Sequence, residues 1–217
     1  MDDAATRRRI MVDTQVRPSD VTQYPIIDAM LEVRREAFLP DPLREAAYVG
    51  QNLPLAPGRV LLEPRTFAKM LEALSLSSKD VVLHLGAGCG YGTAVMARLA
   101  SFVVAIEEDA QLAQGCEQAL IDQGVDNAAV LTGVLAAGMP QTAPFDAIVL
   151  EGAVEDVPQV LLEQIKDGGR IVALFAQDGL GQVRLGRCIE GRIHWRFLFN
   201  ALAPVLPGFE KKKEFAL

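Results

Sequence analysis

The run of residues 81–91, VVLHLGAGCGY, constrains the fold of this chain more than any other feature. A mostly apolar stretch leads into three alternate glycines, Gly86, Gly88 and Gly90, and a second apolar run ends at Glu107. This order is typical of the strand, tight turn, helix and strand that begin a nucleoside-binding α/β sheet. Glycines let the backbone approach a ligand closely, and an acid ending the next strand can accept hydrogen bonds from ribose hydroxyls. The segment therefore indicates a nucleoside-containing cofactor.

The spacing of the glycines favours S-adenosylmethionine as that cofactor. The pattern is G-x-G-x-G, whereas the dinucleotide fingerprint G-x-G-x-x-G needs a later glycine, and Tyr91 and Thr93 stand at the candidate positions. The separation of Gly86 and Glu107 suits nicotinamide and S-adenosylmethionine enzymes equally. An NAD-type oxidoreductase is nevertheless disfavoured, because the third glycine is missing and no hydride-transfer site is evident.

Composition limits the class of protein. The 217 residues are 50% hydrophobic, and no linker divides them, so we expect a single domain. A net charge of −7 and a pI near 4.9 argue against nucleic acid as a partner. Three scattered cysteines and two histidines support neither a disulfide framework nor a metal site. No apolar run has the length of a signal core or a membrane span, so we expect a cytoplasmic protein without a membrane partner. The oligomeric state is not indicated.

Apolar periodicity predicts a helical N-terminal part followed by alternating strands and helices. Two amphipathic helices are expected from about residue 7 to 35, divided at residues 17–20 with Ser19 or Asp20 as a cap. An ordered loop is expected at 47–64, and a helix at 64–76. Beyond the strand of the glycine motif we expect helices at 93–99, 110–123 and 157–166. The strands expected between and after them are at 103–107, 128–132, 147–150 and 170–175.

The last part of the chain changes character. Residues 182–185 and 194–197 alternate at period two around Glu190-Gly191, which predicts an antiparallel hairpin. The predicted fold is thus α/β, with a doubly wound, mostly parallel Rossmann-like sheet and helices on both faces. The single domain at 1–217 would comprise an N-terminal helical and substrate-loop extension at 1–64 and a cofactor-binding core at 65–217.

Several blocks resemble the protein-L-isoaspartate O-methyltransferase family over nearly the whole chain. Met11-Val12 with Gln15-Val16-Arg17 is similar to the family's MVxxQLR, and residues 35–40, REAFLP, to its RExFVP. Residues 47–48 and 53–55 resemble AYxDxPLPI, and Glu63-Pro64 resembles the end of GQTISQP. The glycine turn and residues 144–170 follow the cofactor loop and the family's PFDAI…VPxxLLxQLKPGGR.

The resemblance implies methyl transfer from S-adenosylmethionine to a carboxylate oxygen of damaged aspartyl residues, so a protein or peptide is the expected substrate. An ionised carboxylate and an activated sulfonium need positioning more than acid–base catalysis. We therefore expect an enzyme whose sequence displays no catalytic triad. By resemblance, the cofactor-binding residues are His84, Gly86, Ala87, Gly88, Gly90, Glu107, Glu108 and Val134.

The chain departs from the family at several of these positions. Val60 and Leu62 stand where the family has hydroxyl residues beside the transferred methyl, so no catalytic residue is assigned. Val134 replaces an acid that reaches the adenine amine, and His84 replaces a glutamate. We expect His84 to be a hydrogen-bonded structural residue rather than a base, and Cys89 to be a small turn residue rather than a reactive thiol. The substrate loop is assigned to Gln51, Asn52, Arg59, Leu62 and Glu63.

These departures leave an alternative open. The chain could be a non-catalytic or repurposed relative that binds a nucleoside ligand or a protein partner without isoaspartyl repair. Arg59 could pair with a substrate carboxylate in place of the missing hydroxyls, or it could be a solvated loop charge.

Overall fold

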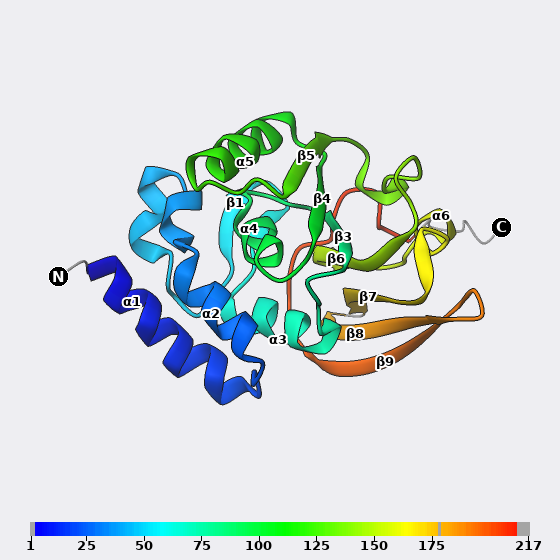
Figure 1. Cartoon of the computed structure of the whole chain (residues 1–217), viewed down its shortest axis with the longest axis horizontal. Helices are drawn as coiled ribbons and strands as arrows, with labels where there is room; N and C mark the ends of the chain where they lie inside the picture. Colours follow the sequence, from blue (N-terminus) through cyan, green and yellow to red (C-terminus); the bar gives the residue numbers. More distant parts are fainter. Residues whose placement is uncertain (1–2, 178, 212–217) are drawn as a thin grey trace.

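The computed structural model describes residues 3–177 and 179–211, and the ends of the predicted domain, 1–2 and 212–217, lie outside the described residues. A seven-stranded sheet forms its centre, with strand order β5-β4-β3-β6-β7-β8-β9 (Figure 1). The pairs from β5 to β7 are parallel, and the last two pairs are antiparallel. This arrangement confirms the predicted mostly parallel sheet closed by an antiparallel hairpin. The strands are β3 (Val81–Leu85), β4 (Phe102–Glu107), β5 (Ala128–Thr132), β6 (Phe145–Val154), β7 (Ile165–Gln177), β8 (Leu180–Ile189) and β9 (Arg192–Asn200).

Side chains that alternate along β3 divide the interior into two cores. Val82 joins the core shared with the N-terminal helices, α3 (Pro64–Leu74), α4 (Tyr91–Ala97) and α5 (Ala110–Asp122). Leu83 and Leu85 join the second core on the other face, under α6 (Gln159–Leu162) and the segment after β9. Both faces are therefore covered, as predicted, although helices dominate only one of them.

The N-terminal extension contains the two expected helices. Helix α1 (Asp3–Met11) continues through a π-helical turn at Val12–Val16 and a 3-10 turn at Arg17–Ser19, and α2 follows at Tyr24–Glu32. The prediction that Ser19 or Asp20 caps α2 is wrong. Asp20 has a positive φ of 62° and ends the first helical run, and three further residues precede the helix. Gln23 is the N-cap, without a side-chain cap bond. Two 3-10 turns, Arg35–Phe38 and Asp41–Ala46, complete the extension.

The segment expected as a loop at 47–64 contains a short β-hairpin, so that prediction is wrong in part. Strand β1 (Leu53–Ala56) pairs antiparallel with β2 (Arg59–Leu61), and these two strands form a separate sheet. The proline and glycine that suggested a loop are both compatible with the hairpin. Pro54 lies on an edge strand, where a missing N–H is tolerated. Gly58 turns the chain with a φ of 69°. Figure 1 shows this hairpin, in cyan, beside α4 and β4.

Strand β6 is longer and α6 shorter than predicted. The chain after β9 returns to the sheet, where Val205 bridges Ala153 in parallel, so β6 continues past Leu150 to Val154. Residues expected in the helix at 157–166 instead begin β7 at Ile165.

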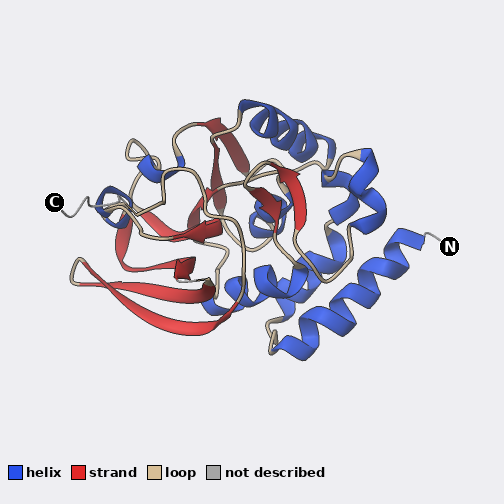
Figure 2. Cartoon of the chain, turned by 180° about the vertical axis from the view of Figure 1, so that it is seen from behind, coloured by secondary structure: helices blue, strands red, loops and turns tan. Residues whose placement is uncertain are grey.

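The predicted C-terminal hairpin is confirmed. Glu190 and Gly191 connect β8 to β9 with positive φ values of 51° and 73°, as a two-residue type I′ turn requires. The segment after β9 then runs across the side of the molecule that faces the viewer in Figure 2. No helix among the described residues is long and apolar enough to cross a membrane.

Candidate functional site

The glycine turn lies where the parallel strands β3 and β4 end, which is the edge at which doubly wound sheets bind ligands. Gly86 and Gly88 have φ values of 80° and 55°, a backbone conformation that glycine adopts without strain. The Gly88 amide donates a hydrogen bond of 2.7 Å to Glu107 Oε2. The structure thus brings together three of the residues that the sequence assigns to the cofactor.

Glu107 is completely buried at the end of β4. Its second oxygen, Oε1, accepts the backbone amides of Glu108 and Asp109 at 3.0 and 3.2 Å. These amides fix the orientation of the carboxylate. The carboxylate thus lies at the mouth of the sheet with three backbone amides bonded to it.

The β1–β2 hairpin lies directly on the glycine turn. A Cβ at Gly88 would be 2.9 Å from Leu55 Cδ1, and a Cβ at Gly86 would be 3.1 Å from Arg59 Nη1. Arg59 is 6% exposed and pairs through Nη2 with Glu107 Oε2. The sequence assigned Arg59 to the substrate loop, whereas in the structure its guanidinium lies against Glu107 and Gly86, two residues that the sequence assigns to the cofactor. Its contact with Glu107 was not foreseen because the hairpin was expected as a loop.

Leu206 is a site residue that sequence reasoning missed. Its side chain, 1% exposed, lies 3.2 Å from the Cβ position of Gly86 and collides with the Cβ position of Gly152 at the end of β6. It is held there by its amide, which donates to the Ala153 carbonyl at 2.8 Å. The only available signal was Gly152 itself, which leaves room beside the glycine turn.

The third glycine of the motif faces another partner. A Cβ at Gly90 would lie 2.9 Å from Cys116 Sγ on α5, so Gly90 permits close helix packing. His84 points to the α4 side of the sheet, with Nδ1 2.9 Å from Thr93 Oγ1 and Nε2 2.9 Å from Glu151 Oε2. The polar contacts of His84 therefore lie with α4 and β6.

Three further residues assigned to the cofactor lie around the turn. Ala87, which lies between Gly86 and Gly88 in the sequence, is buried. Glu108 Oε2 accepts the Leu135 amide at 3.5 Å, which brings the loop after β5 beside the end of β4. Val134 in that loop is 58% exposed, so an apolar surface lies where the resemblance implies the adenine.

Three of the residues assigned to the substrate loop lie together at the surface, whereas Leu62 is buried. Gln51, Asn52 and Glu63 line an open hollow of about 470 Å³, together with Gly50, Gly179, Leu180, Gly181, Asn200, Ala201 and Leu202. Leu62 is completely buried, and its carbonyl accepts Arg35 Nη2 at 2.7 Å. Val60 is half-buried on the hairpin.

Burial governs the ionisable groups next to the turn. Desolvation raises the pKa of Cys89 to about 11 and that of Tyr91 to about 12. The pKa of Cys116 is raised still further, chiefly by desolvation. These groups are neutral at physiological pH, and Cys89 fits the expected role of a small turn residue.

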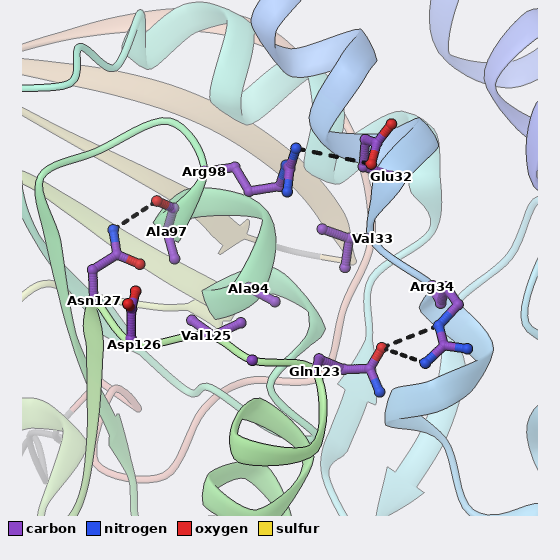
Figure 3. Close-up of a pocket in the computed structure, with 11 residues that line it drawn as sticks. Glu32, Val33, Arg34, Ala94, Ala97, Arg98, Gln123, Val125, Asp126 and Asn127 are labelled. Atoms are coloured by element: carbon purple, nitrogen blue, oxygen red, sulfur yellow. Dashed lines mark hydrogen bonds and ion pairs between the residues drawn. The ribbon is translucent and has the colours of Figure 1, made fainter.

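Another hollow, of about 240 Å³, lies at the edge of the sheet opposite the glycine turn (Figure 3). Arg98 Nη2 lies 4.0 Å from Glu32 Oε2 across it, and Arg34 donates to Gln123 Oε1 at 3.1 and 3.2 Å. Its wall ends at Asn127, immediately before β5 begins, so it lies at the amino ends of the parallel strands. Ligands of this fold bind at the carboxyl ends. Among residues 3–177 and 179–211, no cluster of three metal-ligating side chains occurs.

The residues present fit the nucleoside part of S-adenosylmethionine. The buried Glu107 carboxylate would hold the ribose, and the Gly86–Gly88 turn provides a surface without side chains. The space above that surface is filled by Arg59 and Leu206.

Comparison with known proteins identifies the family. A family model described as protein-L-isoaspartate(D-aspartate) O-methyltransferase matches residues 7–185. A protein-L-isoaspartate O-methyltransferase of Methylorubrum extorquens is 40% identical over 190 residues, which are 88% of this chain and 82% of the relative. Protein-L-isoaspartate O-methyltransferase 2 of Pelobacter propionicus is 40% identical over 166 residues, 76% of this chain and 74% of the relative.

Solved structures agree on the fold. A protein-L-isoaspartate O-methyltransferase superposes with a TM-score of 0.80 at 23% identity, covering 94% of this chain and 65% of that chain. A Plasmodium falciparum relative in complex with S-adenosyl-L-homocysteine also gives 0.80, at 16% identity over 95% of this chain and 99% of that chain. The chain therefore belongs to the protein-L-isoaspartate(D-aspartate) O-methyltransferase family, and it is an S-adenosylmethionine-dependent methyltransferase.

Proposed function

We propose that the methyl acceptor is the free carboxylate of an isoaspartyl residue in a protein or peptide, and that the enzyme acts in a reducing cytoplasm. The proposed identity of the methyl acceptor is supported by the 40% identity with a protein-L-isoaspartate O-methyltransferase over 88% of the chain. The chemistry agrees, because a carboxylate with a pKa of about 4 is already ionised at neutral pH and needs no base. The three buried free cysteines suit a reducing compartment.

The division of labour within the single domain follows the two parts of the sequence. Residues 65–217 supply the cofactor residues Gly86, Gly88 and Glu107, with Ala87, Glu108 and Val134 around them. Residues 1–64 supply the acceptor loop. When bound, the cofactor supplies a methyl group activated by its sulfonium, and the protein positions the acceptor carboxylate in line with it.

The acceptor peptide is proposed to bind in the hollow that Gln51, Asn52 and Glu63 line. Asn52 fixes the walls of this hollow, since Nδ2 donates to the Leu202 carbonyl at 2.7 Å and Oδ1 accepts the Glu63 amide at 2.8 Å. Leu180 and Leu202, 67% and 66% exposed, offer apolar surface for neighbouring side chains of a substrate. The hollow thus offers polar and apolar contacts, as peptide recognition requires.

Arg59 is proposed to bind the acceptor carboxylate. Strand β2 runs from Arg59 at the glycine turn to Leu61, and Glu63 of the hollow follows two residues later. A guanidinium can provide the positive charge and paired donors that Val60 and Leu62 lack. Acceptor binding would then depend on charge rather than on hydroxyl groups.

The test is methyl transfer from radiolabelled S-adenosylmethionine to a synthetic isoaspartyl peptide, with the normal aspartyl peptide of the same sequence as control. We expect transfer to the isoaspartyl peptide to exceed that to the control by at least about tenfold, because only one of them presents the correctly placed carboxylate. Equal or absent transfer, in protein that binds S-adenosylhomocysteine by calorimetry, would show that the acceptor is a different molecule.

A further inference from the structure

The Glu107 carboxylate has little capacity left for a ligand. Oε2 interacts with the Gly88 amide and Arg59 Nη2, and Oε1 accepts the amides of Glu108 and Asp109. A carboxylate accepts about four hydrogen bonds. Three of these partners are backbone amides of the turn and of the chain that follows β4. Among the described residues, Arg59 is the partner that comes from a separate element.

The Arg59 side chain is poorly satisfied in this position. It is 6% exposed, yet Nε and Nη1 have no hydrogen-bond partner among the described residues. A buried donor without a partner is less stable than the same donor in water. The single strong contact with Glu107 is thus opposed by the desolvation of the rest of the guanidinium, which favours exchange when a competing ligand arrives.

The element that carries Arg59 is separate from the main sheet. Strands β1 and β2 pair with each other alone, so no shared strand pairing ties them to the seven-stranded sheet. A Cβ at Gly58 would meet nothing within 4 Å, so the tip of the hairpin lies in open space. Leu61 and Leu62 are buried at its base. A release of Arg59 would therefore involve the exposed tip of the hairpin rather than its buried base.

There is space beside the hairpin to receive such a movement. A hollow of about 380 Å³ borders Leu55 on the side of α5 and is lined also by Phe38, Leu39, Cys89 and Leu112. Leu55 contacts the Gly88 position on one side and this hollow on the other. A shift of Leu55 into the hollow would lift the hairpin from the turn.

We propose that Arg59 is a built-in competitor of the cofactor, which occupies the ribose position on Glu107 and exchanges with the nucleoside when the cofactor binds. Arg59 and the nucleoside cannot both bond to Glu107 Oε2, because the Gly88 amide already donates a hydrogen bond to that oxygen. The observed affinity for cofactor is then the intrinsic affinity multiplied by the fraction of molecules in which Arg59 is released. The inference rests on the proposed function only for the later partner of Arg59, the acceptor carboxylate.

The experiment measures S-adenosylhomocysteine binding by calorimetry, without any acceptor. Arg59→Gln removes the competing charge, and we expect the dissociation constant to fall by about tenfold if Arg59 is released in a tenth of the wild-type molecules. Arg59→Lys keeps a charge without the planar fork and should be intermediate. Arg98→Gln, which removes a half-exposed arginine at the opposite edge of the sheet, serves as the matched control and should bind like wild type.

Thermal unfolding of each variant shows whether it is folded, and Arg59→Lys alone decides the matter if Arg59→Gln does not fold. Unchanged or weaker binding by the folded Arg59 variants would overturn the proposal, as would failure of both variants and wild type to bind. Tighter binding by the Arg59 variants, together with no transfer to an isoaspartyl peptide by the wild-type enzyme, would support the competitor and refute only the proposed acceptor.

Discussion

His84 and Glu151 form a buried pair between adjacent strands, with Nε2 2.9 Å from Oε2 and exposed side-chain fractions of 0% and 3%. Gly92 makes the pair possible, because a Cβ there would collide with the Glu151 carboxylate. Thr93 completes the arrangement from α4 by contacting Nδ1. The strand ends and the helix that follows the glycine turn are thereby fastened together.

Removing one member of this pair should be destabilising. Glu151→Leu leaves the polar Nε2 of a buried imidazole facing an apolar side chain, and we expect the free energy of unfolding to fall by about 1–3 kcal/mol. Urea denaturation measures the change. Glu117→Leu, on the exposed face of α5, is the control and should differ from wild type by less than about 0.5 kcal/mol. A loss for Glu151→Leu no larger than that of the control would contradict the prediction.

A hydroxyl restored at position 60, where the family has one, tests whether this residue contacts the methyl acceptor. Val60→Thr preserves shape at a half-buried position and adds a hydroxyl, so we expect transfer to an isoaspartyl peptide to rise by about two- to tenfold, equivalent to one added hydrogen bond of about 0.5–1.5 kcal/mol. Initial rates at saturating cofactor measure this. An unchanged rate in the folded variant would argue that Val60 lies away from the acceptor.

The companion exchange Leu62→Ser should behave differently. Leu62 is completely buried, so the smaller polar side chain should lower the free energy of unfolding by about 2–5 kcal/mol, as large-to-small core substitutions do. Rates for this variant are therefore interpreted per folded molecule, with the folded fraction taken from urea denaturation. A stability equal to that of Val60→Thr would show that the Leu62 site is less tightly packed than the structure indicates.

The sequence predicted the elements that have a strong local signal. Strands β3 and β4, helix α5 and the turn at Glu190-Gly191 follow from apolar period and glycine position, and each lies where it was expected. Gly86, Gly88 and Glu107 were identified as one site for the same reason, since the order of strand, turn and strand fixes their proximity.

Features that depend on distant segments were not predictable from the sequence. The length of β6 depends on the bridge between Ala153 and Val205, about fifty residues apart in the chain. The contact of Arg59 with Glu107 depends on how the hairpin folds onto the turn, and nothing local to Arg59 encodes it. The pairing of His84 with Glu151 likewise joins two strands that are adjacent only in the sheet.

The cysteines provide a test of burial. All three thiols are free and buried, and desolvation raises the pKa of Cys89 to about 11, so the thiolate is scarce near neutral pH. We expect Ellman's reagent to label none of them rapidly in the folded enzyme at pH 8, and all three after unfolding in guanidinium chloride. Rapid labelling of one thiol that is lost in a Cys89→Ser variant would show that the hairpin exposes the turn.

Asp146 should make stability depend on pH in a defined direction. Desolvation raises the pKa of its carboxyl, but hydrogen bonds from Lys166 Nζ at 2.8 Å and from the Val81 amide at 2.8 Å outweigh it, and the net pKa is lowered. A lowered pKa means that the stabilisation is complete above the unfolded value of about 3.9 and is lost as the pH falls through the folded value. Asp146→Asn should therefore cost about 1 kcal/mol between pH 5 and 7, a small figure because Lys166 is partly exposed.

Urea denaturation of wild type and Asp146→Asn at several pH values measures this difference directly. The gap between the two proteins should be constant from pH 7 to 5 and should narrow below about pH 4, as the wild-type carboxyl becomes protonated. Lys166→Gln serves as the matched control, because it removes the same hydrogen bonds from the other side and should weaken the pH dependence. A gap that stays constant down to the lowest pH at which both proteins remain folded would contradict the assignment, since it would mean that Asp146 acts through packing rather than charge.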